Sequence, residues 1–376
     1  MTENRIRPIV MPKWGLSMSK GTVTGWLVKP GAKVKIGDEL LEVETEKIAS
    51  VVEAGDQGTL RRIIGEPETV YPVKALLGVL ADDDVSDSEI DAYVASYVMP
   101  AAEEEEEAEP QYHLVDLLSG RVRYAKRGEG DADAIVLIHG LGGDLDNWLF
   151  NIDALAAEAN VYALDLPGHG QSSKNIADPT LHGLAQALIA FMDEVGIDHA
   201  HLVGHSLGGA IAMQTAVDSP GRVRSLALIG SAGLGPEINS GYIDAFITAG
   251  SRRELKPVLQ HLFAKKDLVS RQLVDDVLKY KRLDGVNDAL KKLSSSLFAG
   301  GRQQAQLGDA LRRVTIPTMV IWGEDDEIIP VKHAAALTGK ARTHVIGGTG
   351  HMVQMEAANT VNALLKEHIR AADCDH

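Results

Sequence analysis

The sequence predicts two domains, a small all-β domain followed by a larger α/β domain with a mostly parallel sheet. Short β-like runs separated by glycine and proline turns fill residues 1–83, and this spacing favours a small sandwich or flattened barrel. Across residues 112–376, apolar strand candidates alternate with helical patterns, which is typical of a parallel sheet covered on both faces. A chain of 376 residues is also longer than one hydrophobic core typically accommodates, which favours two domains.

In the first domain, turn residues recur every few positions. Pro30 and Gly31 separate an apolar run at 25–28 from an alternating run at 39–43, and a further β-like run begins at residue 49. The short segment between the last two runs contains Lys47, which we therefore expect at the tip of a hairpin. A lysine at such a tip is exposed and can carry a tethered group through solvent.

Residues 84–111 predict a short amphipathic helix followed by an acidic linker. Ser86 and Glu89 fit a capping box ahead of an apolar helical stripe. We interpret this helix as packing back on a domain, with a docking peptide for a partner subunit as the alternative. Residues 84–110 hold ten acidic residues and no Lys or Arg, which indicates a solvated spacer, or alternatively a docking tail.

The second domain is predicted from apolar runs that alternate with helical spacing. The strand candidates are residues 134–139, 161–165, 201–206, 225–229 and 318–322. The stretch from about 235 to 305 interrupts this rhythm with charged, helix-like segments. We interpret it as a helical lid inserted into the α/β domain.

Composition excludes several classes of protein. The net charge is −16, and no basic patch offsets phosphate repulsion, so nucleic acid is not an expected partner. Without a long apolar run or a signal-peptide core, we expect a cytoplasmic protein that does not associate with membranes. The single cysteine, Cys374, excludes an intramolecular disulfide. The histidines lack metal-ligand spacing, so no metal is expected.

The segment Gly204-His205-Ser206-Leu207-Gly208 is a G-x-S-x-G motif. It follows an apolar run and precedes a small-residue run that indicates a helix start. A sharp strand-to-helix turn of this kind holds the middle serine in a strained, exposed position. The motif therefore predicts that Ser206 is a nucleophile.

A nucleophilic serine needs a base, which α/β folds usually supply in the chain order serine, acid, histidine. His351 follows a glycine-rich run at 347–350 and is expected to act as base and then as acid. An acidic cluster at 324–327 stands at the end of the last strand candidate. Backbone N–H groups of Leu141 and Leu207 are expected to form the oxyanion hole, because both residues follow the ends of predicted strands.

Residues 1–83 resemble the lipoyl domain of 2-oxo-acid dehydrogenase complexes. The resemblance rests on Glu44-Thr45-Glu46-Lys47 within a frame of glycines, with Glu46 in place of the family's Asp. Biotin carriers place the lysine between methionines, which this turn lacks. The resemblance implies lipoate covalently bound to Lys47 and recognition by a lipoate ligase or transferase, with Gly31 and Glu44 as weaker recognition features.

Residues 112–376 resemble the α/β-hydrolase superfamily in the order of their motifs. By analogy with the family's W-G-x-x-D-x-x-x-P spacing, which begins here at Trp322, the triad acid is Asp326, with Asp325 as its rival. The resemblance thus implies a catalytic triad of Ser206, Asp326 and His351.

The two domains together resemble the dihydrolipoamide acetyltransferase subunit of acetoin dehydrogenase complexes. In that family, subunits of a thiamine diphosphate-dependent acetoin dehydrogenase supply the acetyl group, coenzyme A accepts it, and dihydrolipoamide dehydrogenase reoxidises the arm. The H-x-x-x-D-G motif of other 2-oxo-acid acyltransferases is absent, since none of the thirteen histidines has Asp four residues later. We therefore expect an acetyl-Ser206 intermediate that coenzyme A resolves.

Two other functions remain open. The protein could be a carrier-linked thioesterase or carboxylester hydrolase that uses water as acceptor, because no sequence signature for coenzyme A stands out. It could also be a lipoyl carrier whose hydrolase fold is catalytically idle, which the complete serine, aspartate and histidine order disfavours.

Overall fold

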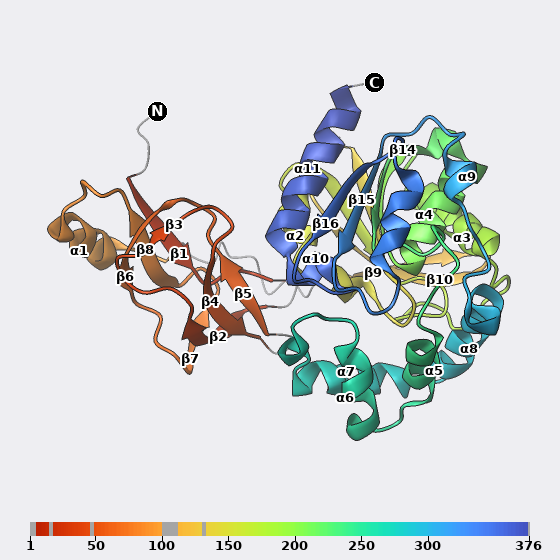
Figure 1. Cartoon of the computed structure of the whole chain (residues 1–376), viewed down its shortest axis with the longest axis horizontal. Helices are drawn as coiled ribbons and strands as arrows, with labels where there is room; N and C mark the ends of the chain where they lie inside the picture. The colour runs from red at the N-terminus through yellow and green to blue at the C-terminus, as the bar shows by residue number, and fades with distance from the viewer. Residues whose placement is uncertain (1–4, 15–17, 46–48, 100–111, 130–132, 375–376) are drawn as a thin grey trace. The chain divides into compact units, whose positions relative to one another are not determined.

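The computed structural model describes residues 5–14, 18–45, 49–99, 112–129 and 133–374. The chain divides into two compact units, Met1–Pro110 and Gln111–His376. The first is an all-β domain with one helix, and the second is an α/β domain (Figure 1). The predicted fold class, a small all-β domain joined to an α/β domain with a mostly parallel sheet, is confirmed.

The first unit contains two four-stranded antiparallel sheets, ordered β1-β8-β6-β3 and β5-β4-β2-β7. Alternate side chains of both sheets point into one core, where Met11, Val23, Leu41 and Leu60 are fully buried. The strands are β1 (Ile6–Val10), β2 (Lys20–Trp26), β3 (Lys33–Val34), β4 (Glu39–Glu44), β5 (Ala49–Glu53), β6 (Gly58–Ile63), β7 (Thr69–Pro72) and β8 (Leu76–Ala81).

Strands β4 and β5 form the hairpin that the sequence predicts around Lys47. They pair antiparallel up to the facing residues Glu44 and Ala49, so the connection between the strands is four residues long. Lys47 itself lies outside the described residues.

Helix α1 (Asp87–Ser96) follows the first unit's last strand and packs back on it. Ser86 and Glu89 form the predicted capping box, and Ile90 is fully buried against the sheet that contains β8. Arg61 also donates to Asp87 over 2.8 Å. The acidic linker predicted at the end of 84–111 lies almost wholly outside the described residues, because 100–111 are not among them.

The second unit is built on an eight-stranded sheet of order β16-β15-β14-β13-β11-β12-β10-β9. The six strands from β16 to β12 are parallel, and β10 and β9 continue the sheet antiparallel. The strands are β9 (Tyr112–Leu117), β10 (Gly120–Arg127), β11 (Ala134–Ile138), β12 (Asn160–Leu164), β13 (Ala200–His205), β14 (Val223–Ile229), β15 (Thr318–Gly323) and β16 (Arg342–Ile346).

Helices cover both faces of this sheet. The pair α3 and α4 lies on the opposite side from α2 and α11 in Figure 1. The helices are α2 (Ile152–Ala156), α3 (Leu181–Glu194), α4 (Leu207–Asp218), α9 (Gly308–Leu311), α10 (Val353–Glu356) and α11 (Ala358–Cys374). The 3₁₀ turns are η1 (Leu145–Trp148), η2 (Pro220–Arg222), η3 (Lys266–Leu268), η4 (Ala299–Gly301) and η5 (Val331–Leu337).

Four further helices form a separate group between β14 and β15 (Figure 1). They are α5 (Ser240–Thr248), α6 (Arg252–Gln260), α7 (Arg271–Lys281) and α8 (Val286–Leu297), and we call them the lid. A bridge between Glu237 and Arg302 joins the two ends of this insertion. Among the described helices, none combines the length and the apolar character that a bilayer crossing requires.

Candidate active site

Ser206 stands on the sharp turn between β13 and α4, with φ 54° and ψ −117°. A positive φ is strained for a residue with a Cβ atom, and such strain concentrates at functional sites. The neighbouring glycines make the turn possible, because a Cβ atom on Gly204 would lie 2.4 Å from the carbonyl oxygen of Gly208. A Cβ on Gly208 would lie 2.0 Å from the carbonyl oxygen of Ile138. The G-x-S-x-G spacing is therefore a steric requirement of this turn.

His351 and Asp326 form a buried pair near this turn. Nδ1 of His351 lies 2.8 Å from Oδ2 of Asp326, and their side chains are 3% and 0% exposed. Hydrogen bonding through Nδ1 leaves Nε2 as the nitrogen that can exchange a proton with a nucleophile. Ser206 and His351 both line one pocket. Among the described residues, no hydrogen bond joins the two side chains, as is common when no substrate is bound.

Asp326 is held rigidly, and Asp325 is not part of the pair. The backbone N–H groups of Ile328 and Ile329 donate to Oδ1 of Asp326 over 2.8 and 2.9 Å. These bonds leave Oδ2 to His351. Asp325 is exposed, and its backbone N–H donates to Thr349. The structure thus brings His351 together with the second of the two aspartates.

The loop after β11 lies against the serine turn. A Cβ atom on Gly140 would lie 3.0 Å from Cβ of Ser206, so the backbone beside Leu141 approaches Ser206 closely. Leu141 lines the pocket of Ser206, and Leu207 is the first residue of α4. N–H groups at the start of a helix have no partner within the helix. Both positions therefore suit donors to an oxyanion.

Buried side chains that the sequence analysis did not select hold these loops. Nε2 of His139 accepts from the N–H of Leu166, while its Nδ1 lies 2.7 Å from the oxygen of Gly140. The Asp165 carboxylate accepts from Arg123 over 2.6 Å and from the N–H of Leu145 over 2.9 Å. The loop after β11 is thus fixed to the end of β12. Asp165 stands at a strand end, which is the only sequence signal for this role.

Glu356 fixes the loop that carries His351. Its carboxylate accepts from the N–H of Gly350 over 2.6 Å and from that of Ala264, in the lid segment, over 2.9 Å. Burial raises the pKa of Glu356, and its backbone hydrogen bonds oppose that rise. The same carboxylate thus holds both the loop that carries His351 and the lid segment at Ala264.

His205 is a structural neighbour of the pair. Its ring lies 4.7 Å from that of His351, centroid to centroid, and its Nε2 is 3.0 Å from the backbone oxygen of His351. Burial, and then the charge of His351, hold the pKa of His205 well below its usual range. A neutral His205 adds no charge next to the His351–Asp326 pair.

The pocket over Ser206 is mostly apolar. Its empty volume is about 790 Å³, part of which is open to solvent. The lid covers it with side chains such as Phe246, Leu259, Leu273 and Val277, and His205, Ser206 and His351 line its opposite wall. An apolar, lid-covered site excludes water and strengthens the electrostatic interactions inside it. This arrangement suits acyl transfer through a serine ester.

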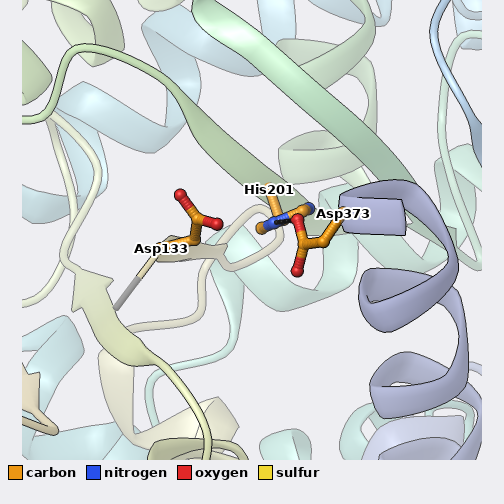
Figure 2. Close-up of side chains that lie close together, drawn as sticks. All are labelled: Asp133, His201 and Asp373. Atoms are coloured by element: carbon orange, nitrogen blue, oxygen red, sulfur yellow. Dashed lines mark ion pairs between the residues drawn. The ribbon is translucent and has the colours of Figure 1, made fainter. Parts of the chain in front are cut away.

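A separate polar cluster could hold a metal ion. Figure 2 shows Asp133, His201 and Asp373, whose ligand atoms all lie within 4.8 Å of one another. Nε2 of His201 is 3.0 Å from Asp373, and Arg224 lies 3.2 Å from Asp133. The cluster lies at the amino ends of β11 and β13, whereas Ser206 follows the carboxyl end of β13. Arg224 already balances the negative charge of Asp133. Because the cluster also lies at the opposite end of β13 from Ser206, we assign it no part in the chemistry at Ser206.

Two family models match the chain. Residues 133–358 match the alpha/beta hydrolase fold, and residues 7–77 match a family described as biotin-requiring enzymes. A dihydrolipoyllysine-residue acetyltransferase component of the acetoin cleaving system of Cupriavidus necator is 55% identical over 97% of both chains. The corresponding component of Pseudomonas putida is 44% identical, over 97% of this chain and all of that protein.

The second unit also resembles solved hydrolases. A meta-cleavage product hydrolase from Pseudomonas fluorescens is 25% identical and has a TM-score of 0.64. The match covers 69% of this chain and 98% of that one. The likeness therefore lies in the α/β domain, while the first unit distinguishes this chain from such hydrolases.

Proposed function

The chain belongs to the dihydrolipoyllysine-residue acetyltransferase components of acetoin cleaving systems, and from that premise we propose that Ser206 carries the acetyl group on its way from lipoyl-lysine to coenzyme A. Membership makes the protein an acyltransferase and a part of a multienzyme system. The observation that carries the proposal is the strained Ser206 turn, which shares its lid-covered pocket with His351, the residue paired with Asp326.

Lys47 is the proposed site of covalent lipoate. The four-residue connection between β4 and β5 supports this, because the sequence then places Lys47 within a short hairpin connection, as in lipoyl domains. When bound, lipoate supplies the thiol that presents the acetyl group as a thioester. Protein made in lipoate-sufficient cells should show the adduct by intact mass, and Lys47→Arg should lack it. An adduct that survives this substitution would exclude Lys47.

In the first half-reaction, His351 accepts the Ser206 proton at Nε2 as Oγ attacks the thioester carbonyl carbon. The N–H groups of Leu141 and Leu207 stabilise the negative charge that develops on the carbonyl oxygen. The carbon–sulfur bond then breaks, and His351 donates its proton to the departing thiolate. The acetyl group is left as an ester on Ser206, and Asp326 holds the His351 ring in place throughout.

In the second half-reaction, His351 takes the proton of the coenzyme A thiol. The sulfur attacks the acetyl carbon, the bond from that carbon to Oγ breaks, and Ser206 regains its proton. The apolar lining that the lid contributes favours this thiol acceptor over water, because it offers few hydrogen-bond partners to a water molecule beside the ester. The likeness to hydrolases favours the alternative, in which water resolves the ester and the protein is a thioesterase or carboxylester hydrolase.

Two measurements test this function. Acetyl-loaded protein is mixed with coenzyme A, and acetyl-coenzyme A is quantified against free acetate; an excess of acetate would establish the water route. In the second, a labelled acetyl donor is added without coenzyme A and the reaction is quenched rapidly. The covalent route requires label on Ser206. Loss of the triad serine typically costs on the order of 10⁶ in turnover, so unchanged transfer by Ser206→Ala would contradict it.

The proposed partners follow from the same premise. They are the thiamine diphosphate-dependent subunits that load the arm, dihydrolipoamide dehydrogenase, which reoxidises it, and the lipoate ligase or transferase that modifies Lys47.

A further inference from the structure

The cluster of Asp133, His201 and Asp373 joins three parts of the second unit that are distant in sequence (Figure 2). Asp133 directly precedes β11, His201 is the second residue of β13, and Asp373 lies in the last turn of α11. One donor atom from each side chain lies within 4.8 Å of the other two. Because the three residues are far apart in the chain, no spacing motif reveals them, and the sequence analysis expected no metal.

His201 is the buried member of the cluster, with a side chain that is 1% exposed. Its Nε2 lies 3.0 Å from Oδ1 of Asp373, yet among the described residues this nitrogen has no hydrogen-bond partner. The distance suits a hydrogen bond, so it is the direction of the contact that fails. Buried polar atoms are nearly always satisfied. A buried nitrogen that faces a carboxylate without bonding to it therefore points to a ligand.

A cation between the two groups accounts for both the distance and the direction. Bonds from Zn²⁺ to imidazole nitrogen and carboxylate oxygen are about 2.1 Å long. An ion bound to two atoms 3.0 Å apart therefore lies about 45° off the line that joins them. The lone pair of Nε2 on His201 would point at the ion and past the oxygen of Asp373. The structure shows this relationship, since the two atoms are close but not aligned for a hydrogen bond.

The other ring nitrogen of His201 is held as in metal-binding histidines. Its Nδ1 lies 2.9 Å from Oγ of Ser225, a buried residue of β14. When the Nδ1–H group donates to this hydroxyl, the lone pair of Nε2 is left for a metal ion. Burial lowers the pKa of His201, and the charge of Asp373 opposes this shift. Burial thus favours the neutral ring that metal binding requires.

The charges and exposure of the two carboxylates also suit a cation. Arg224 contacts Oδ1 of Asp133 over 3.2 Å, and a carboxylate has a second oxygen that can bind an ion. With a neutral His201, one guanidinium faces two carboxylates, so the cluster keeps one negative charge. The side chains of Asp133 and Asp373 are 39% and 35% exposed, so an ion and its water ligands can enter from solvent. Two ligands of one ion span at most about 4.2 Å, which a small turn of the Asp133 carboxylate provides.

We propose that Asp133, His201 and Asp373 bind a divalent transition-metal ion, with water completing its coordination. One imidazole and two carboxylates are donors that Zn²⁺ accepts. The ion ties the last turn of α11 to the amino ends of β11 and β13. It stabilises the second unit, because an ion that binds only the folded state lowers the free energy of that state. This site is independent of acetyl transfer at Ser206.

The test uses the full-length protein with its lipoate in the disulfide form, so that lipoyl thiols do not bind the ion. After treatment with a chelator and its removal, calorimetry measures Zn²⁺ binding, visible absorption measures Co²⁺ binding, and thermal unfolding is recorded with and without Zn²⁺. The variants are Asp133→Asn, Asp373→Asn and the double variant. The matched control is Asp218→Asn, because Asp218 lies 2.8 Å from Nδ1 of His182 in an ordinary hydrogen bond. Cys374→Ser tests the neighbouring thiol.

We expect the parent to bind one Zn²⁺ per chain and to show the d–d absorption of bound Co²⁺. Each single Asn variant should raise the dissociation constant about tenfold or more, since even the loss of an outer partner of a metal ligand has this effect. At about 100 times the dissociation constant, Zn²⁺ should raise the unfolding midpoint of the parent by roughly 5 °C or more. The double variant should not respond to Zn²⁺, whereas Asp218→Asn and Cys374→Ser should match the parent.

Three results would overturn the site. One is the absence of saturable binding of one Zn²⁺ per chain by the parent. Another is equal affinity in the parent and the double variant. The third is loss of binding in Cys374→Ser with binding intact in Asp133→Asn, which would place the ion at the C-terminal tail. If one Asn variant unfolds in the metal-free state, the affinity of the other single variant decides between these outcomes.

Discussion

Oδ2 of Asp326 lies 2.8 Å from Nδ1 of His351, while its Oδ1 accepts two backbone N–H groups from Ile328 and Ile329. Both oxygens of this buried carboxylate therefore have partners: Oδ1 bonds the backbone of the loop, and Oδ2 bonds His351. Asp325, the preceding residue, is exposed. This difference makes the two neighbouring aspartates a matched pair for experiment.

We expect Asp326→Asn to lower kcat for acetyl transfer by about 10⁴, because an amide at this position holds the imidazole in the wrong tautomer. Asp325→Asn should leave kcat within about twofold of the parent value, since surface substitutions of this kind have small effects. Steady-state assays of acetyl transfer measure kcat for both variants. Equal losses in the two would contradict the assignment of Asp326 as the triad acid.

The buried ion pair between Arg123 and Asp165 should matter for stability. Their side chains are 7% and 0% exposed, so Arg123→Met leaves a buried carboxylate with only backbone donors. We expect a loss of about 3 kcal/mol in the free energy of unfolding, measured with urea. The control is Arg121→Met on the same strand, whose pair with Asp116 is exposed and should contribute less than about 1 kcal/mol. Similar losses of unfolding free energy in both variants would show that the buried pair stabilises the fold no more than the exposed pair does.

The motifs predicted more of the candidate site's geometry than of the scaffold around it. The G-x-S-x-G segment marks the serine turn because only glycine fits at 204 and 208, and this steric demand can be read from a short run of residues. The spacing from Trp322 to Asp326 is equally local, since the loop that folds back on the carboxylate is only a few residues long.

What the sequence did not predict depends on longer-range contacts or on weak patterns. The sequence analysis did not predict strands β9, β10 and β16. They lie at or near the sheet edges and mix exposed with half-buried residues, which obscures the alternation expected of a strand. The roles of Asp165 and Glu356 arise from partners 42 and 92 residues away. No local pattern identifies such partners.

Asp144 should make stability depend on pH. Burial, followed by the charges of Asp146 and Asp165, raises the pKa of Asp144 to about 7, above the usual value of about 3.9 in an unfolded chain. The folded state therefore binds more protons than the unfolded state between these two values. The contribution of Asp144 to the free energy of unfolding is therefore present at low pH, and it is lost as the pH rises from about 4 to 7.

Asp144→Asn should accordingly be more stable than the parent at pH 8, with the difference shrinking toward pH 5. Asparagine retains the N-cap of η1, where the side chain of Asp144 accepts from the N–H of Asp146. Urea unfolding at several pH values measures this. The exposed Asp309→Asn on α9 serves as control and should show a pH profile like that of the parent. A constant difference between Asp144→Asn and the parent across this range would mean that Asp144 is ionised throughout.

The acidic segment between the two units should act through its length. It lies outside the described residues, and the sequence predicts a solvated spacer there, for which a length of about a dozen residues would allow a reach of roughly 20 Å. A carrier that visits several active sites needs this reach, so deletion of residues 103–109 should lower the flux of the assembled system. Transfer from free acetyl-dihydrolipoamide to coenzyme A by the same variant should be unchanged, because the Ser206 pocket belongs to the second unit alone.

Replacement of Glu103–Glu107 by glutamine keeps the length of the segment and removes its charge. If flux falls in the glutamine variant as much as in the deletion, charge rather than reach is the limiting property, and unchanged flux in both would show that neither limits coupling.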